Sequence, residues 1–202
     1  MRALLVTAGS RGDIEPFLAL ARRLRRQGHD AVVALPDASG ADASDLETLS
    51  LGADFTEVIR TQGVSPIAAM RSLRTVIRPL MRAVLVGAAR AVHEVGPDVV
   101  VSHPKVLSAA MAADTLGIPH VVAELVPAMT PTREFPAAGT VSVDLGPLNR
   151  LTYAATAAGE RMFSAELDAA AAELGLSRRP RHHSAAAAHL VPVSAGILSR
   201  PH

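Results

Sequence analysis

Asp13 is the side chain in this sequence whose setting most favours acid–base chemistry. It lies in the stretch VTAGSRGDIEPFLALARRL (residues 6–24), where an apolar run is followed by a glycine-containing turn and a helical pattern. Gly9 and Gly12 permit a tight turn. Two roles fit a carboxylate at this position. It can cap the helix that follows, or it can serve as a general base for a substrate hydroxyl within hydrogen-bond reach.

The same turn could instead hold a phosphate group, but its spacing argues against the known phosphate motifs. The glycines do not follow the G-x-G-x-x-G pattern of dinucleotide-binding proteins, and no Lys-Ser or Lys-Thr pair follows them as in a P-loop. We therefore expect neither a dinucleotide nor a nucleoside triphosphate at this turn.

Three further ionisable side chains accompany apolar runs typical of strands. His103 and Lys105 come just after the run PDVVVS, and Glu124 lies near the end of IPHVVAEL. His103 either has a structural role or works together with Asp13. An unpaired buried carboxylate is costly, so Glu124 should face a pocket or a cation. If Glu124 approaches Asp13, the pKa of one of the two carboxyl groups should rise, as an acid–base pair requires.

Other candidate binding residues lie in less regular sequence. Arg133 and Glu134 either form an exposed ion pair or order the proline-rich loop that contains them. Met70 and Met129 are candidates to line an apolar pocket. Together with Arg133 and Lys105, they are predicted substrate contacts. The four histidines of residues 182–202 lie in an alanine-rich stretch without i, i+4 pairing, so we expect no metal site.

The composition excludes several classes of protein. Cysteine is absent, which excludes disulfides, thiolate catalysis and zinc–cysteine sites. The net charge is +1 and aromatic residues make up 2% of the chain, so we expect no nucleic-acid partner, which would need a basic face with stacking aromatics. No apolar run approaches the roughly 20 residues that span a bilayer, and the first residues lack a signal-peptide pattern. A cytoplasmic protein is expected.

Alternating strands and helices must position the candidate residues. The predicted strands are 2–7, 31–35, 53–59, 97–102, 118–125 and 189–194, the predicted helices are 16–27, 42–51, 66–95, 104–116 and 148–175, and residues 126–147 form a long loop. Pro79 should kink or split the longest helix. This alternation predicts a Rossmann-like α/β fold, a parallel sheet with helices on both faces. Ligands of such sheets bind beyond the carboxyl ends of the strands, where Asp13, His103 and the loop after Leu125 should lie.

Three ordered stretches of the sequence resemble one family of enzymes. They are GSRGDIEPFLALARRLRRQGHDAVVALP (residues 9–36), PDVVVSHPKVLSAAMAADTLGIPHVVAELVPAMTPTREFP (97–136) and LGPLNRLTYAATAAGERMF (145–163). All three are similar to GT-B glycosyltransferases of the sterol-glucosyltransferase and macrolide/glycopeptide type, in the amino-terminal half that binds the acceptor. The resemblance implies that Asp13 is the general base and that Ser10 and Gly12 shape its loop. It also implies inversion at the sugar's anomeric carbon.

The sequence departs from that family in two respects. The second domain, which binds the nucleotide sugar, is absent: residues 1–176 are predicted to form the acceptor-binding domain, and residues 177–202 a tail and the start of an interdomain linker. The family usually has Asn-Pro-Lys or Asp where His103 stands, and apolar residues or proline where Glu124 stands. Glu124 is therefore the best sign of altered chemistry.

These observations predict a truncated glycosyltransferase-like protein that binds an apolar natural-product acceptor in secondary metabolism, such as antibiotic biosynthesis. Asp13, His103 and Glu124 are the catalytic candidates, and we expect no sugar transfer by the isolated chain. It should bind no cofactor itself, and a nucleotide sugar would enter only through a donor domain supplied elsewhere. One alternative is an enzyme with sugar-independent acid–base chemistry, a cyclase, lyase or isomerase. The other is a non-catalytic partner of a donor-domain chain, which, like a second copy, would dock at the carboxyl edge of the sheet.

Overall fold

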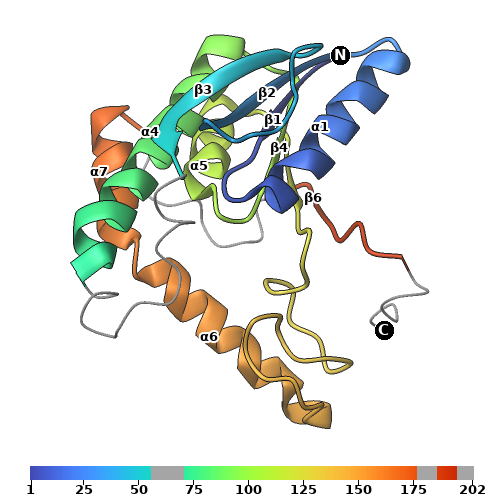
Figure 1. Ribbon diagram of the computed structural model, residues 1–202, viewed down its shortest axis with the longest axis vertical. Helices are drawn as coiled ribbons and strands as arrows, with labels where there is room; N and C mark the ends of the chain where they lie inside the picture. The colour runs from blue at the N-terminus through green and yellow to red at the C-terminus, as the bar shows by residue number, and fades with distance from the viewer. Residues whose placement is uncertain (56–70, 177–185, 195–202) are drawn as a thin grey trace.

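A six-stranded parallel sheet forms the centre of the molecule. The computed structural model describes residues 1–55, 71–176 and 186–194 (Figure 1). The strands are β1 (Arg2–Val6), β2 (Asp30–Asp37), β3 (Glu47–Asp54), β4 (Val99–Ser102), β5 (His120–Ala123) and β6 (Ala188–Leu190). They lie in the order β3-β2-β1-β4-β5-β6, and every neighbouring pair is parallel. This confirms the predicted Rossmann-like α/β fold.

The central strands are apolar on both faces because helices or chain segments cover both. In β1, Leu4 and Val6 pack into one hydrophobic cluster while Ala3 and Leu5 pack into the other, and all four are fully buried. Successive side chains of a strand point to opposite faces, so a strand buried on both faces reads as a continuous apolar run. This is why the runs predicted strands 2–7 and 97–102 close to their observed positions.

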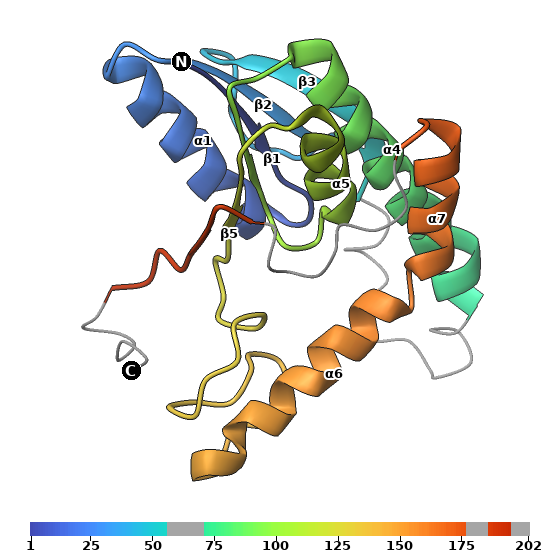
Figure 2. The ribbon, with the colours of Figure 1, turned by 180° about the vertical axis from the view of Figure 1, so that it is seen from behind.

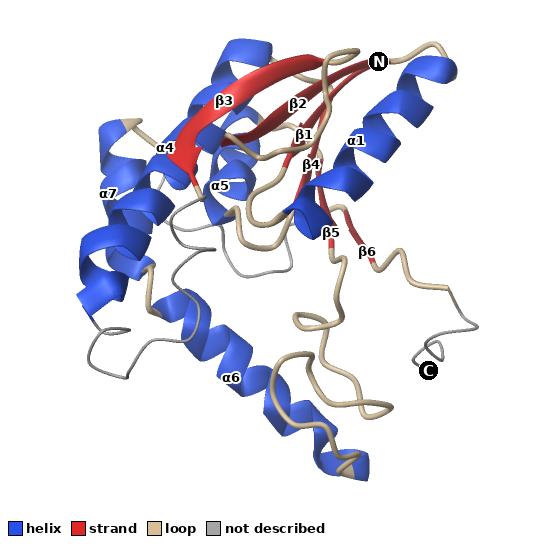
Figure 3. Ribbon diagram, in the orientation of Figure 1, coloured by secondary structure: helices blue, strands red, loops and turns tan. Residues whose placement is uncertain are grey.

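Helices cover both faces of the sheet (Figures 2 and 3). On one face lie α4 (Arg78–Val95) and α5 (Leu107–Leu116), and α7 (Ser164–Glu173) packs against these two helices. On the other face lies α1 (Arg11–Arg26). The helix α4 packs directly on the β3 backbone: a Cβ added at Gly87 would overlap the carbonyl of Leu51. Within the described part of the chain, no helix is long and apolar enough to cross a membrane.

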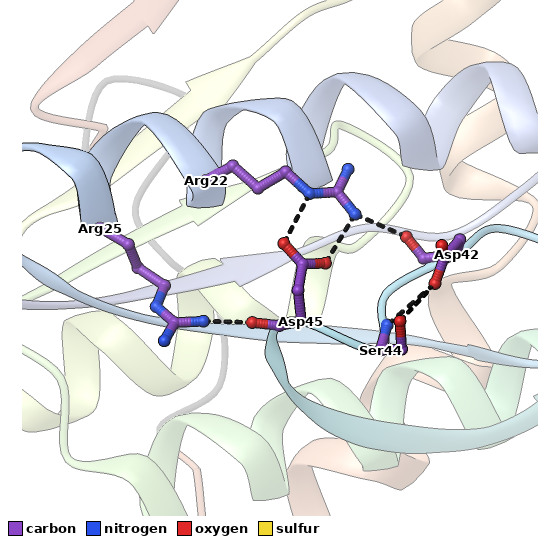
Figure 4. Close-up of polar contacts among 5 residues, drawn as sticks. All are labelled: Arg22, Arg25, Asp42, Ser44 and Asp45. Carbon is purple, nitrogen blue, oxygen red and sulfur yellow. Dashed lines mark hydrogen bonds and ion pairs between the residues drawn. The ribbon is translucent and has the colours of Figure 1, made fainter.

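The predicted helix at 42–51 is wrong. Residues 38–46 form an irregular connection that runs beside α1, and the next strand, β3, already begins at Glu47. Figure 4 shows why: Arg22 binds both carboxylate oxygens of Asp45 at 2.8–2.9 Å, and its guanidinium also donates to the carbonyl of Asp42 at 2.7 Å. Arg25 donates to the carbonyl of Asp45. Held by these contacts, residues 38–46 cover the sheet without forming a helix.

Two helices begin or break differently from the sequence prediction. α1 starts at Arg11, one turn before the predicted residue 16, so Pro16 lies inside it. Residues 71–95 are helical throughout, so Pro79 does not split this helix. A π-helical turn at Leu73–Ile77 directly precedes α4, whose second residue is Pro79, so the helix is irregular next to the proline. The region predicted as one helix at 148–175 forms α6 (Asn149–Arg161) and α7. With the loop before it, α6 projects away from the sheet in both views (Figures 1 and 2).

Candidate active site at the carboxyl edge of the sheet

Asp13 lies in the first turn of α1, directly beyond the carboxyl end of β1. Its Oδ2 accepts the backbone N–H of Ser10 at 2.8 Å and the Ser10 hydroxyl at 3.0 Å. Its carbonyl oxygen accepts the Thr7 hydroxyl at 2.8 Å. Ser10, not Asp13, is therefore the capping residue of α1, and Asp13 is the third helical residue reaching back to it. Asp13 therefore does contribute to capping, as predicted, but from the third helical position and by accepting the N–H of the capping residue.

The other oxygen of Asp13 faces two side chains from the turn after β4. His103 Nε2 lies 3.3 Å from Oδ1, and Lys105 Nζ lies 3.1 Å from the same atom. The strands β1 and β4 are parallel neighbours, with Val6 opposite Ser102, so the turns that follow them meet at one edge. The structure thus brings together four of the predicted site residues: Ser10, Asp13, His103 and Lys105.

The ring of His103 is held in one orientation. It is buried, packs against Phe17 with ring centroids 6.2 Å apart, and accepts the backbone N–H of Lys105 on Nδ1 at 3.2 Å. A ring nitrogen that accepts a hydrogen bond carries no proton, which assigns the proton of the neutral ring to Nε2. His103 is therefore a hydrogen-bond donor to Asp13 in this state, and it has no free nitrogen for a substrate.

The surroundings of Asp13 hold the pKa of its carboxyl group well below the ordinary value of 3.8. Partial burial, the largest single influence, acts to raise this pKa. It is outweighed by the His103 hydrogen bond, the positive charge and hydrogen bond of Lys105, and the Ser10 amide together. Asp13 is consequently ionised throughout the physiological pH range, as an acceptor of protons or of hydrogen bonds must be.

Gly9 is the glycine that this site requires. Its φ of +130° is rarely adopted by other residues, and an added Cβ would overlap Asp13 Oδ2 and approach Lys105 Nζ to 3.0 Å. Gly12, by contrast, is helical, and a Cβ there would meet only the Ser10 hydroxyl oxygen, at 3.7 Å. Gly9, and not Gly12 as predicted, is therefore the glycine that shapes the loop. The sequence feature that could have indicated this is its position just before the capping serine.

Glu124 binds the loop that follows β5. It is completely buried, and its carboxylate accepts the backbone N–H groups of Ala128 (2.6 Å), Met129 and Thr130 (3.3 Å) and the Thr130 hydroxyl (2.9 Å). The prediction that Glu124 faces a cation or pocket is not supported by these contacts. The hydrogen bonds of its carboxylate within the described residues all go to this loop, and none reaches Asp13, so the structure gives this side chain a positioning role.

The other residues predicted to contact substrate either lie away from the Asp13 cluster or fall outside the described residues. Met129 is half-buried, and its amide is one of the donors to Glu124. Arg133 is exposed, and its carbonyl accepts the side-chain amide of Asn149 at 2.8 Å. The ion pairs of the described residues include none between Arg133 and Glu134. Met70 lies outside the described residues.

Sequence reasoning missed three residues that hold this loop against α6. Asn149, fully buried at the start of the helix, also donates to Asp144 at 2.7 Å and accepts the amide of Leu145 at 2.9 Å. Thr152 accepts the amide of Ala137 at 2.7 Å, and the Tyr153 hydroxyl donates to the carbonyl of Phe135 at 3.3 Å. The two sequence motifs around residues 132–136 and 149–153 therefore bind each other, which their order along the chain did not reveal.

A groove of about 350 Å³ lies at the other end of α1 from Asp13. It is lined by Arg22, Arg25, Arg26, Asp45 and Leu46. Two of these arginines are engaged with the connection between β2 and β3 (Figure 4). The groove is therefore part of the scaffold that fixes this connection and does not belong to the Asp13 cluster.

Comparison with known proteins places these features in a family context. Residues 3–130 match the glycosyltransferase family 28 N-terminal domain. The chain is 34% identical over 169 residues to the O-mycaminosyltylonolide 6-deoxyallosyltransferase of Streptomyces fradiae, covering 76% of this chain and 38% of that protein. It is 28% identical over 141 residues to a sterol 3-beta-glucosyltransferase of Candida albicans, covering 65% of this chain and 9% of that protein. The chain thus spans well under half of either relative.

Solved structures show the same fold. The glycosyltransferase SnogD from Streptomyces nogalater superposes with a TM-score of 0.57 at 19% identity, covering 96% of this chain and 46% of that one. The calicheamicin glycosyltransferase CalG4 gives a TM-score of 0.57 at 18% identity, covering 88% of this chain and 44% of that one. The present fold therefore corresponds to somewhat less than half of each of these glycosyltransferases.

Proposed function

Because this chain belongs to the glycosyltransferase family 28 N-terminal domain family, we propose that it binds the acceptor of a glycosyl transfer and that Asp13 is the general base. The observation that carries the proposal is the position of Asp13. It is an ionised carboxylate at the carboxyl edge of the sheet, held by Ser10, His103 and Lys105. In parallel α/β sheets this edge is where ligands bind.

In the proposed reaction, Asp13 takes the proton of an acceptor hydroxyl as that oxygen attacks the anomeric carbon of a nucleotide sugar. The new C–O bond forms while the bond to the diphosphate breaks, and the diphosphate leaves with the electron pair. His103 donates to Asp13 throughout and so fixes the direction in which the carboxylate points. Attack from the face opposite the leaving group inverts the anomeric carbon.

The acceptor is proposed to be an apolar natural product or a sterol-like molecule. The support is the names of the relatives, a deoxysugar transferase acting on a tylonolide derivative and a sterol glucosyltransferase. The diphosphate leaving group needs hydrogen-bond donors or cations to stabilise its charge. We assign none of the described residues to that task. We therefore propose that the nucleotide sugar is bound by a donor half outside the present sequence.

The test is an assay of the chain with a macrolide aglycone or a sterol, with and without a nucleotide sugar and a separately expressed donor half from a relative. We expect glycoside only when the sugar and the donor half are both present. Asp13→Asn should lower the rate about a hundredfold to ten-thousandfold, whereas Asp114→Asn, an exposed carboxylate on α5, should leave it unchanged. Conversion of the acceptor without sugar would instead favour a lyase, cyclase or isomerase, and full activity of Asp13→Asn would refute the base.

A further inference from the structure

The Asp13 carboxylate has no hydrogen-bonding position left for a substrate proton. A carboxylate offers about four lone-pair sites, two on each oxygen. Here Oδ2 accepts the amide and hydroxyl of Ser10, and Oδ1 accepts His103 Nε2 and Lys105 Nζ. All four partners are donors. If Asp13 is to take a proton from an acceptor hydroxyl, one of these donors must first leave.

Only Lys105 is free enough to leave. The Ser10 donors belong to the same helical turn as Asp13 and are fixed by its backbone, where Asp13 N–H donates to Ser10 O at 2.9 Å. The His103 ring is buried and held by Phe17 and by the Lys105 amide. The Lys105 side chain is 52% exposed and binds Asp13 through Nζ alone. A long, exposed lysine has the rotamer freedom to swing away at little cost.

Building on the proposed function, we infer that Lys105 is an exchangeable counter-ion of Asp13, drawn away by an oxygen of the acceptor. Nζ lies 3.1 Å from Oδ1 before the exchange, and the Lys105 side chain stays attached to the turn after β4. The oxygen that draws Nζ away must therefore lie close to the hydroxyl that replaces it on Oδ1. Oxygens on adjacent carbons meet this condition. Lys105 Nζ can only donate, so the neighbouring oxygen need only accept, as a carbonyl does. The acceptor class inferred is an α-hydroxy ketone, whose hydroxyl donates to Asp13 while its carbonyl accepts from Lys105.

The exchange explains how a strongly hydrogen-bonded carboxylate becomes a useful base. While Lys105 is on Oδ1, its charge stabilises the ionised form of Asp13 and weakens its attraction for a proton. Once Nζ moves to the carbonyl, the hydroxyl takes its place on Oδ1. The proton passes from the acceptor oxygen to Asp13 as that oxygen bonds to the anomeric carbon of the nucleotide sugar, and the sugar–diphosphate bond breaks. An acceptor with an isolated hydroxyl must displace Lys105 without giving Nζ a new partner, so it is expected to bind more weakly.

The probes that test this inference are two D-ring hydroxysteroids that differ only by a ketone on the carbon next to the hydroxyl. Binding of each to the present chain is measured by isothermal titration calorimetry, without any sugar. The wild type should bind the hydroxy ketone about tenfold more tightly than the plain alcohol, the value of one hydrogen bond to a charged group. Lys105→Met should bind both steroids equally. Arg11→Met removes a nearby positive charge that pairs with Glu15 instead, and it should keep the preference.

A second measurement follows the titration of the Asp13 carboxyl carbon by NMR. Lys105→Met should raise the Asp13 pKa towards its ordinary value, and the hydroxy ketone should raise it in the wild type but not in Lys105→Met. Equal binding of the two steroids by the wild type, with no change in Lys105→Met, would overturn the inference and leave the acceptor-binding role intact. Binding of neither steroid by any of the three proteins would overturn both.

Discussion

At the scale of single residues, the site depends on how many donors meet one carboxylate. Asp13 was identified from its type and its place after a predicted strand, and its partners His103 and Lys105 from their place after another. The number of donors, however, depends on distances between two turns that are some 90 residues apart along the chain, which no local pattern contains. The same holds for Gly9, whose importance comes from a side chain that lies over it.

Replacing Gly9 by alanine should disrupt the site. The new Cβ would overlap Asp13 Oδ2, and the backbone would be strained at a φ of +130°. We expect a loss of about 1–3 kcal/mol in the free energy of unfolding, measured by urea denaturation, and loss of the Asp13 titration shift. Gly12→Ala is the matched control. It lies within α1, where alanine should be neutral or stabilise by about 0.5–1 kcal/mol. A Gly9→Ala protein as stable as wild type would contradict this account.

At the scale of elements, buried polar groups decide how the segments that leave the sheet are held. The helix predicted at 42–51 fails because Arg22 and Arg25 bind the backbone and side chains of this connection from α1. Such tertiary contacts override local propensity. Similarly, the sequence indicates that Glu124 is unusual in an apolar run, but most of the donors that bind its carboxylate are backbone amides, which every sequence contains. Residue type alone cannot tell them from a bound cation.

Removing the Glu124 carboxylate should loosen the loop that follows β5. In Glu124→Ala, the amides of residues 128–130 would lose a buried charged acceptor, so we expect a destabilisation of about 3 kcal/mol. Glu124→Gln, which keeps one carbonyl acceptor, should lose less. Urea denaturation measures the stability, and hydrogen exchange should speed up first at residues 128–130. Glu134→Ala, an exposed carboxylate in the same loop, should stay within about 0.5 kcal/mol of wild type.

At the scale of the whole molecule, most of the architecture followed from the sequence because the central strands are buried on both faces. Such strands give continuous apolar runs that are hard to mistake. The strand order could not be read in the same way, because β6 comes from beyond α7 and joins the sheet beside β5 with only three residues. Its register depends on pairing with a distant strand, not on its own composition.

The buried histidine at the start of β5, His120, should make the fold sensitive to acid. Burial is the main cause that lowers the pKa of His120 from 6.5 to about 4, with the charge of His189 adding to it, and Ser102 Oγ lies 2.8 Å from Nε2. The unfolded chain then binds a proton that the folded chain does not, between pH 6.5 and 4, so stability falls as the pH falls. We expect a loss of about 3 kcal/mol by pH 4.

Urea denaturation at pH 7, 5.5 and 4 measures this loss. His120→Gln should flatten the dependence over that interval, whereas His29→Gln, at a less buried position after α1, should not. A wild-type protein of equal stability at pH 7 and pH 4 would rule out a buried neutral His120.

The mutual binding of the loop and α6 has a consequence for how this segment can be exchanged between related proteins. The side chains of Glu124, Asn149, Thr152 and Tyr153 bind partners between residues 124 and 153. A segment that contains its own fastenings can be transplanted between homologues as a cassette, without redesign of the sheet beneath it. A chimera that takes this segment from a homologue should therefore be joined after β5 and after the end of α6 at Arg161.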